Sequence, residues 1–215
     1  IDVIVNCAAY TAVDKAEDNK ELCDKLNRVA PGYLAKAAQS RNASIIQVST
    51  DYVFDGTNHI PYKEEEPTCP ASVYGTTKLA GEQNVLEHCH NSVIIRTAWL
   101  YSIFGNNFVK TMIRLGQERD TLGVVFDQVG TPTYARDLAR AIYAIINKGI
   151  VRGVYHFSDE GVCSWYDFTK AIHRLSGISC DVKPLHSEDF PAKAPRPHYS
   201  VLDKTKIKET FGIVI

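Results

Sequence analysis

Short runs of β-branched apolar residues alternate with longer segments of helical periodicity along this chain, and no other feature constrains its fold as strongly. The strand-like runs lie at 2–6, 44–48, 92–96, 122–126 and 154–157. The helical segments lie at 12–40, 72–88, 107–117, 134–148, 165–175 and 205–211. Because this alternation is typical of strands joined through crossover helices, it predicts an α/β fold with a parallel sheet.

Proline and capping residues set several expected boundaries. Pro31 predicts a break or kink inside the first helical segment. Ser72 is expected to cap the helix that follows an irregular loop at 50–71. The proline-rich segment 184–197 predicts a loop that packs or binds, rather than part of a sheet.

Composition argues against several classes of partner. The chain is 45% hydrophobic and 23% charged, and its net charge of -1 gives no reason to expect nucleic acid or an anionic membrane as a partner. The sequence has no apolar run long enough to cross a bilayer and no secretory leader at its start, so we expect a cytoplasmic protein.

The cysteines and histidines do not predict a metal site. Six cysteines are scattered without a C-x-x-C pair, and reduced thiols are expected in an α/β chain of this size. The sequence His88-Cys89-His90 stands at an expected helix end, where adjacent side chains point in different directions. Since no second ligand pair lies nearby, we interpret it as a solvated helix terminus.

A hydroxyl, a phenol and an amine define the candidate site. Tyr74 and Lys78 are four residues apart, so they share one helix face. An ammonium close to a phenol favours the phenolate, which predicts that Lys78 lowers the pKa of Tyr74. Thr50 follows a strand, at the edge where open α/β sheets bind ligands. Such a set suits proton transfer coupled to hydride transfer on a carbonyl or alcohol.

The spacing Y-x-x-x-K is weak evidence by itself, since Tyr166 and Lys170 repeat it. That second copy follows no strand-end Ser/Thr loop, and Trp165 and Phe168 give its helix an apolar packing face. We therefore interpret the second copy as structural and the first as functional.

Several motifs in order resemble the dTDP-4-dehydrorhamnose reductases, a family of the extended short-chain dehydrogenase/reductase superfamily. They are NCAAYTAVD at 6–14, STDYVFDG at 49–56, YGTTK at 74–78, RTAWLY at 96–101, GTP at 130–132 and APRP at 194–197. The resemblance implies a Rossmann-like doubly wound parallel sheet with a smaller C-terminal α/β substrate domain. Residues 1–100 would then be the later part of the NAD(P)-binding domain and 101–215 mainly the substrate domain, with about 120–150 returning to the first.

The resemblance also implies an activity and a set of site residues. The activity would be NADPH- or NADH-dependent reduction of the C4 keto group of dTDP-4-dehydro-6-deoxy-L-mannose, in nucleotide-sugar and cell-surface polysaccharide biosynthesis. The catalytic residues would be Thr50, Tyr74 and Lys78. The cofactor-contacting residues would be Ala9, Tyr10, Thr11 and Val48, with Tyr74 and Lys78. The sugar-contacting residues would be Thr50, Asp51 and Trp99.

Two positions separate this chain from related enzymes. Sugar-nucleotide dehydratases of the superfamily carry a carboxylic acid after the T-D pair, where this chain has Tyr52. Epimerases and dehydratases tend to carry asparagine where Trp99 stands. Reduction without elimination fits best, with the indole covering the apolar face of a deoxysugar. The alternative interpretation of Trp99 is a strand-end core residue.

The family's glycine-rich phosphate turn is absent from the sequence, so we expect a fragment that lacks an N-terminal part and binds nicotinamide nucleotide poorly. We therefore expect the fragment to be inactive. Some relatives are magnesium-linked dimers, but no Mg²⁺ ligands can be identified here, and a homodimer stays open. Two alternatives also stay open: a non-catalytic regulatory subunit on the same fold, and a reductase of another nucleotide deoxysugar.

Overall fold

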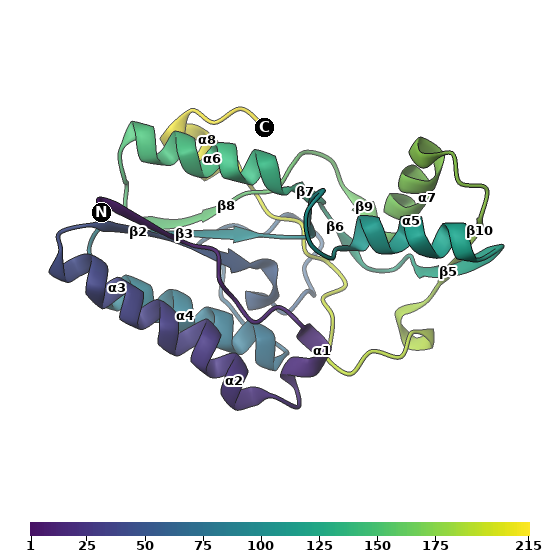
Figure 1. The fold of residues 1–215 in the computed structure, drawn as a ribbon, viewed down its shortest axis with the longest axis horizontal. Coiled ribbons are helices and arrows are strands. Elements are labelled where there is room, and N and C mark those ends of the chain that lie inside the picture. Colours follow the sequence, from purple (N-terminus) through teal and green to yellow (C-terminus); the bar gives the residue numbers. More distant parts are fainter.

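A four-stranded parallel sheet forms the centre of the molecule (Figure 1). The computed structural model describes all 215 residues. The strands are β1 (Val3–Asn6), β2 (Ser44–Thr50), β3 (Ser92–Thr97) and β8 (Gly153–His156). They lie in the order β1-β2-β3-β8, and every neighbouring pair is parallel. The predicted α/β class and four of the predicted strands are therefore confirmed.

Helices cover both faces of this sheet. On one face lie α3 (Ala30–Ser40) and α4 (Val73–His88), and on the other lie α6 (Ala135–Lys148) and α8 (Thr205–Phe211) (Figure 1). Because side chains alternate along a strand, Ile45 packs toward α3 and α4 while Ile46 packs toward α6. Both residues are fully buried, so the sheet has an apolar core on each side.

The helical region 12–40 is interrupted at 17–19, and near Pro31, where the sequence predicts a break or kink, it widens into a π turn without a break. It consists of α1 (Val13–Ala16), α2 (Lys20–Asp24), a π turn η1 (Lys25–Val29) and α3. Pro31 lies in the first turn of α3, where its missing N–H costs least. Its ring would crowd the carbonyl of Asn27 in a regular helix, and the wider π turn relieves this.

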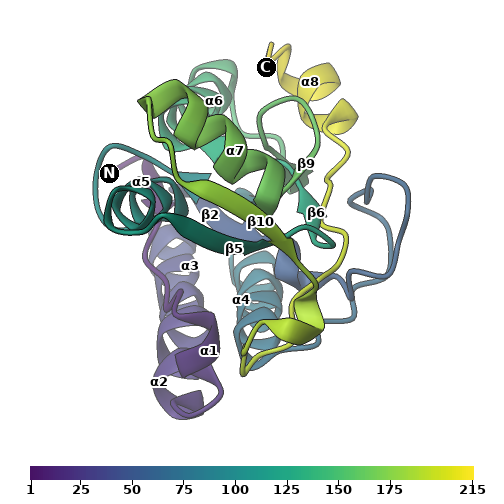
Figure 2. The same ribbon diagram turned by 90° about the vertical axis from the view of Figure 1, so that its right-hand side faces the viewer.

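A smaller unit stands beside the central sheet (Figure 2). It combines α5 (Phe108–Glu118) and α7 (Trp165–Ser176) with the parallel pair β5 (Thr121–Val125) and β10 (Asp181–Leu185) around its own apolar cluster. The strand β10 corrects the sequence analysis, which assigned Pro184 to a loop. A proline fits there because β10 pairs with β5 alone. On the unpaired side of the strand no backbone N–H has to donate a hydrogen bond to a neighbouring strand.

Short strands join the two parts. The pair β4 (Leu100–Tyr101) and β7 (Thr133–Tyr134) is parallel, and β6 (Val129–Gly130) pairs antiparallel with β9 (Cys163–Ser164). None of these was predicted, because two residues are too few to show an alternating pattern.

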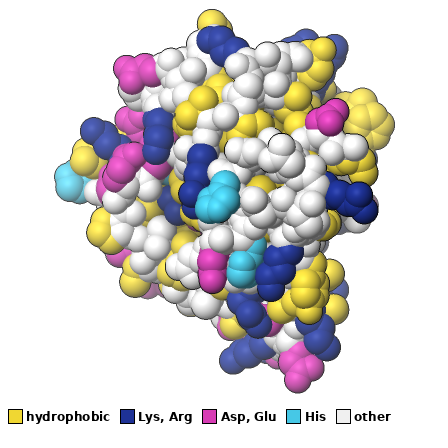
Figure 3. Space-filling model, turned by 90° about the vertical axis from the view of Figure 1, so that its left-hand side faces the viewer, with side chains coloured by type: hydrophobic (Ala, Val, Ile, Leu, Met, Phe, Trp, Pro, Cys, Tyr) yellow, Lys and Arg dark blue, Asp and Glu magenta, His cyan; other side chains and the backbone are white.

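The two ends of the central sheet differ. Its strands point their carboxyl ends toward the smaller unit (Figures 1 and 2). The opposite end carries charged, histidine and hydrophobic side chains intermixed (Figure 3). No helix of the structure is long and apolar enough to cross a membrane.

Candidate active site

Thr50 and Asp51 lie where β2 ends at the carboxyl edge of the sheet. A 3-10 turn, η2 (Asp51–Val53), begins directly after Thr50. The Thr50 Oγ1 accepts a hydrogen bond from the Tyr52 N–H at 3.2 Å and donates one to Asp51 Oδ1 at 2.9 Å. Both side chains are buried, so this turn fixes the hydroxyl at the strand end.

Helix α4 brings Tyr74 to the same place. Ser72 caps the helix, as predicted, by accepting a hydrogen bond from the Gly75 N–H at 3.1 Å. A Cβ on Gly75 would lie 2.2 Å from the Tyr52 carbonyl oxygen. Only glycine therefore lets the first turn of α4 abut η2 closely. This contact sets Tyr74 beside Thr50 and Tyr52.

Burial, not Lys78, dominates the electrostatics of Tyr74. Burial raises the pKa of the Tyr74 phenol, while the interaction with the neighbouring Thr50 hydroxyl lowers it. The expectation that Lys78 lowers this pKa is wrong in this structure. The Lys78 ammonium instead donates to the Val48 carbonyl at 2.7 Å. Tyr74 is therefore a protonated phenol at neutral pH, in the form that can donate a proton.

Lys78 is buried with its ammonium beside β2. Burial lowers the pKa of Lys78 to about 8, and the Glu82 carboxylate opposes this effect. The ammonium uses one donor on Val48, which leaves two N–H groups. The two predicted site residues Val48 and Lys78 are thus in direct contact.

Asp51 has an unusual environment for a carboxylate. It is 3% exposed, and its Oδ2 has no hydrogen-bond partner. Burial raises the pKa of Asp51 to about 6, against the effect of the Thr50 hydrogen bond. A buried acceptor of this kind can bind a hydroxyl group of a ligand.

Trp99 is held by other aromatic and small residues. Its backbone has a φ of 49°, which is strained for a side chain of this size. The indole stacks on Trp165, with ring centroids 3.4 Å apart and planes at 9°. A Cβ on Gly130 would lie 2.7 Å from the Trp99 ring and 2.7 Å from Ser200 Oγ. No local sequence pattern marks Trp165 as the partner of Trp99, because the two residues lie in separate segments.

The loop after β1 carries the predicted cofactor-contacting residues. Asn27 fixes Tyr10 by accepting from its N–H at 2.8 Å and donating to its carbonyl at 3.1 Å. Ala9 and Tyr10 are half-buried and Thr11 is exposed. The loop is thus ordered and accessible at the same sheet edge as Lys78, and the remaining N–H groups of that ammonium suit the hydroxyls of a ribose. These residues fit part of a nicotinamide nucleotide.

An arginine that the sequence analysis did not assign connects three segments. Arg196 donates to the Tyr52 hydroxyl at 3.1 Å and to Asp14 Oδ2 at 2.6 Å. The Tyr52 ring in turn meets the Tyr74 ring edge-on, with centroids 5.4 Å apart. The APRP motif at 194–197 was the only signal for this contact in the sequence.

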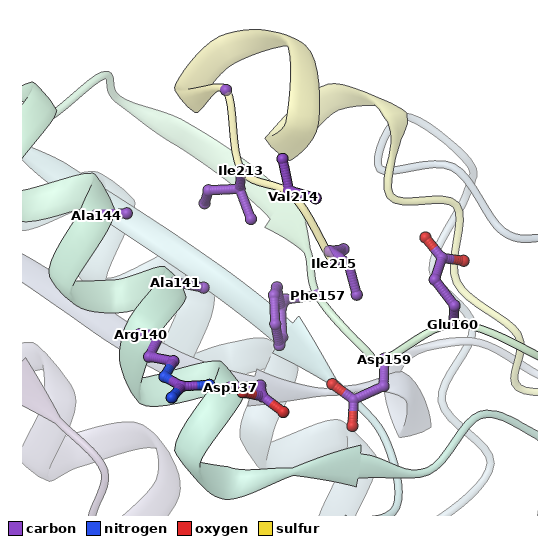
Figure 4. Close-up of a pocket in the computed structure, with 11 residues that line it drawn as sticks. Asp137, Arg140, Ala141, Ala144, Phe157, Asp159, Glu160, Ile213, Val214 and Ile215 are labelled. Atoms are coloured by element: carbon purple, nitrogen blue, oxygen red, sulfur yellow. Dashed lines mark hydrogen bonds and ion pairs between the residues drawn. The ribbon is translucent and has the colours of Figure 1, made fainter.

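Two other features lie apart from this site. Tyr166 packs against the apolar cluster of the smaller unit, and Lys170 is exposed. A cavity of about 600 Å³ lies between α6 and residues 212–215 (Figure 4). None of Thr50, Tyr74 and Lys78 lines it, so it belongs to a different part of the molecule.

Comparisons with known proteins agree on one family. The family described as RmlD substrate binding domain matches residues 1–215. A dTDP-4-dehydrorhamnose reductase of Aggregatibacter actinomycetemcomitans is 45% identical, over 99% of this chain and 76% of the relative.

Two solved structures agree with this family assignment. A crystal structure of a dTDP-4-dehydrorhamnose reductase from Clostridium acetobutylicum has a TM-score of 0.95 and 49% identity, over 98% of this chain and 74% of that one. The Bacillus anthracis enzyme in complex with NADP has a TM-score of 0.94 and 42% identity, over 97% and 74%. The chain therefore belongs to the dTDP-4-dehydrorhamnose reductase family.

Proposed function

We propose that this protein reduces the C4 keto group of dTDP-4-dehydro-6-deoxy-L-mannose to give dTDP-L-rhamnose, with NADPH or NADH as the reductant. The observation that carries the proposal is the convergence of Thr50, Tyr74 and Lys78 at the carboxyl edge of β2. The names of the relatives, which are dTDP-4-dehydrorhamnose reductases, support the substrate.

Each of the three residues has a distinct role in the proposed reaction. A reduced nicotinamide, when bound, supplies the hydride. Tyr74 donates the proton to the oxygen at C4, because burial keeps its phenol protonated at neutral pH. The Thr50 hydroxyl orients Tyr74 and the substrate oxygen by hydrogen bonds. The Lys78 ammonium binds the ribose hydroxyls of the cofactor with the two donors that Val48 leaves free.

The sugar would lie against Asp51 and Trp99. The free Oδ2 of Asp51 accepts a hydrogen bond from a sugar hydroxyl. The indole of Trp99, fixed by Trp165, offers an apolar surface to the C6 methyl group and the apolar face of the deoxysugar. Tyr52 hydrogen-bonds Arg196 and offers no carboxylic acid for water elimination. The reaction therefore stops at reduction.

Substitution of Tyr74 tests this function. The assay follows cofactor absorbance with the keto-sugar, on the protein as its gene encodes it, so that any residues flanking 1–215 are present. Tyr74→Phe should lower kcat by at least about 100-fold, the usual contribution of a general acid. Tyr166→Phe is the matched control, because it removes the same hydroxyl from the second Y-x-x-x-K copy. Near-normal turnover in Tyr74→Phe would contradict the assignment.

Substrate profiling separates the alternatives. Faster turnover of another nucleotide deoxysugar would change the substrate. No turnover of any nucleotide sugar, together with a stoichiometric enzyme partner, would indicate a regulatory subunit. We also propose that residues 101–215 supply most of the remaining substrate contacts, because Trp165 and Ser200 lie beside Trp99 and Asp51.

A further inference from the structure

A buried carboxylate lies one helical turn beyond Lys78. Tyr74, Lys78 and Glu82 are spaced by four residues along α4, so all three occupy the face that packs on the sheet. Lys78 is 4% exposed and Glu82 is 2% exposed. A carboxylate buried to this degree must be neutralised by hydrogen bonds and opposite charge.

Two strands hold this carboxylate. Ser49 on β2 donates to Glu82 Oε1 at 2.5 Å. Arg96 on β3 donates through Nε to Oε1 at 3.0 Å and through Nη2 to Oε2 at 2.8 Å. Its side chain is 5% exposed, and its Nη1 has no partner. The two-point contact fixes the carboxylate plane in one orientation.

Three buried charged groups, Arg96, Glu82 and Lys78, follow one another from the core toward the candidate site. The groups that face Lys78 are the Glu82 carboxylate and the thiols of Cys7 and Cys23. Glu82 is therefore the only carboxylate that favours the ammonium form of Lys78, and burial opposes that form. Without Glu82, the cations Lys78 and Arg96 would be buried with no anion between them.

We propose that Glu82 is a positioning residue for Lys78, keeping its ammonium charged beside the Val48 carbonyl from one turn along the same helix face, and that Ser49 and Arg96 hold Glu82 in place. This inference rests on the proposed function, in which Lys78 binds the cofactor ribose as an ammonium. A purely structural ion pair would stabilise the fold without affecting the protonation of Lys78.

The test measures the titration of Lys78 in variants of Glu82. NMR of the protein with ε-carbon-labelled lysine reports each lysine, and loss of one signal in Lys78→Arg assigns the signal of Lys78. In Glu82→Gln the pH at which Lys78 titrates should fall by about one unit or more. Glu82→Asp keeps the charge and should titrate close to the parent.

A kinetic measurement gives the functional consequence. The alkaline limb of kcat/KM should move to lower pH in Glu82→Gln, so that for a fall of one unit the activity at pH 8 drops about fourfold more than the activity at pH 6.5. The NMR result needs no turnover. A parent protein that turns over no nucleotide sugar, with the titration of Lys78 shifted in Glu82→Gln, would overturn the proposed function alone. An active parent protein with an unshifted titration in Glu82→Gln would overturn the role of Glu82 alone.

A second variant covers the case in which Glu82→Gln does not fold. Removal of one partner of a buried pair is strongly destabilising, whereas replacement of both is better tolerated. Glu82→Gln combined with Arg96→Met removes both charges and still leaves Lys78 without a carboxylate. Because removal of Arg96 also removes a cation that opposes the ammonium form, the reference for this variant is Arg96→Met alone. Equal titration of Lys78 in these two variants would refute the proposal.

Discussion

Asp51 illustrates a conflict between stability and function at one residue. Its pKa is raised to about 6 in the folded protein, from an unfolded value of about 3.9. The folded state therefore binds the proton more tightly, and this contribution to stability is fully present below about pH 4. It is lost as the pH rises through about 6, so at neutral pH the buried carboxylate destabilises the fold.

Asp51→Asn should therefore stabilise the protein at pH 7 by up to about 3 kcal/mol, a gain that disappears below about pH 4. Urea unfolding at both pH values measures the change. Asp120→Asn is the control, because Asp120 is an exposed aspartate just after α5. Asp51→Asn should also bind the nucleotide sugar more weakly, since an amide has one acceptor oxygen instead of two. Equal stability of Asp51→Asn and the parent at pH 7 would contradict this account.

At the scale of elements, the π turn η1 and helix α4 fit each other through one glycine. A Cβ on Gly81 would lie 2.0 Å from the Asn27 carbonyl oxygen. Asn27 also fixes the loop at Tyr10 and donates to Thr77 Oγ1 at 3.3 Å. The close approach of α4 therefore connects the helix that carries Tyr74 and Lys78 to the loop after β1.

Gly81→Ala should separate these elements. Backbone atoms must move to admit the methyl group, and we expect a loss of about 1–3 kcal/mol in the free energy of unfolding. Calorimetry measures the change in Tm. Thr76→Ala, on the exposed side of the same helix, controls for helix propensity and should be near neutral. An unchanged Tm in Gly81→Ala would show that the contact is not tight.

Helices and strands whose apolar residues recur with a clear period could be predicted from the sequence. Contacts between residues that are distant in the sequence could not. The Ser72 cap and α4 were predicted because their signals are local. The strand β10 was missed because it contains Pro184, and proline is excluded from strands that hydrogen-bond to a neighbour on both sides. The stack of Trp99 on Trp165 and the contact of Glu82 with Arg96 join separate segments, so no local pattern reports them. The candidate site could be predicted because its signals are local. Thr50 stands at the end of a strand, and Tyr74 and Lys78 follow the Ser72 cap on one helix.

At the scale of the whole molecule, the loop at 186–198 binds to residues beside the candidate site. Asp14 accepts from the N–H groups of Lys193 and Ala194 as well as from Arg196. Arg196 in turn reaches Tyr52, next to Tyr74. Arg196 and Asp14 therefore connect the loop to helix α1 and turn η2.

Arg196→Ala should release this connection. Amide hydrogen exchange in residues 186–198 and in η2 should become faster, because the loop loses its charged contacts to Asp14 and Tyr52. Lys193→Ala in the same loop is the matched control. Its exposed ion pair with Asp18 is worth little. Equal exchange in the two variants would show that Arg196 does not hold the loop.

The contact of Arg196 with Asp14 spans 182 positions of sequence. Long-range contacts close late in folding, because the entropy of a large loop is lost before the contact can compensate for it. A nascent chain can therefore build β2, η2 and α4 while Tyr52 still lacks its final neighbour. The environment of Tyr74 is completed only after residue 196 has been synthesised, because Arg196 is the last neighbour that Tyr52 gains.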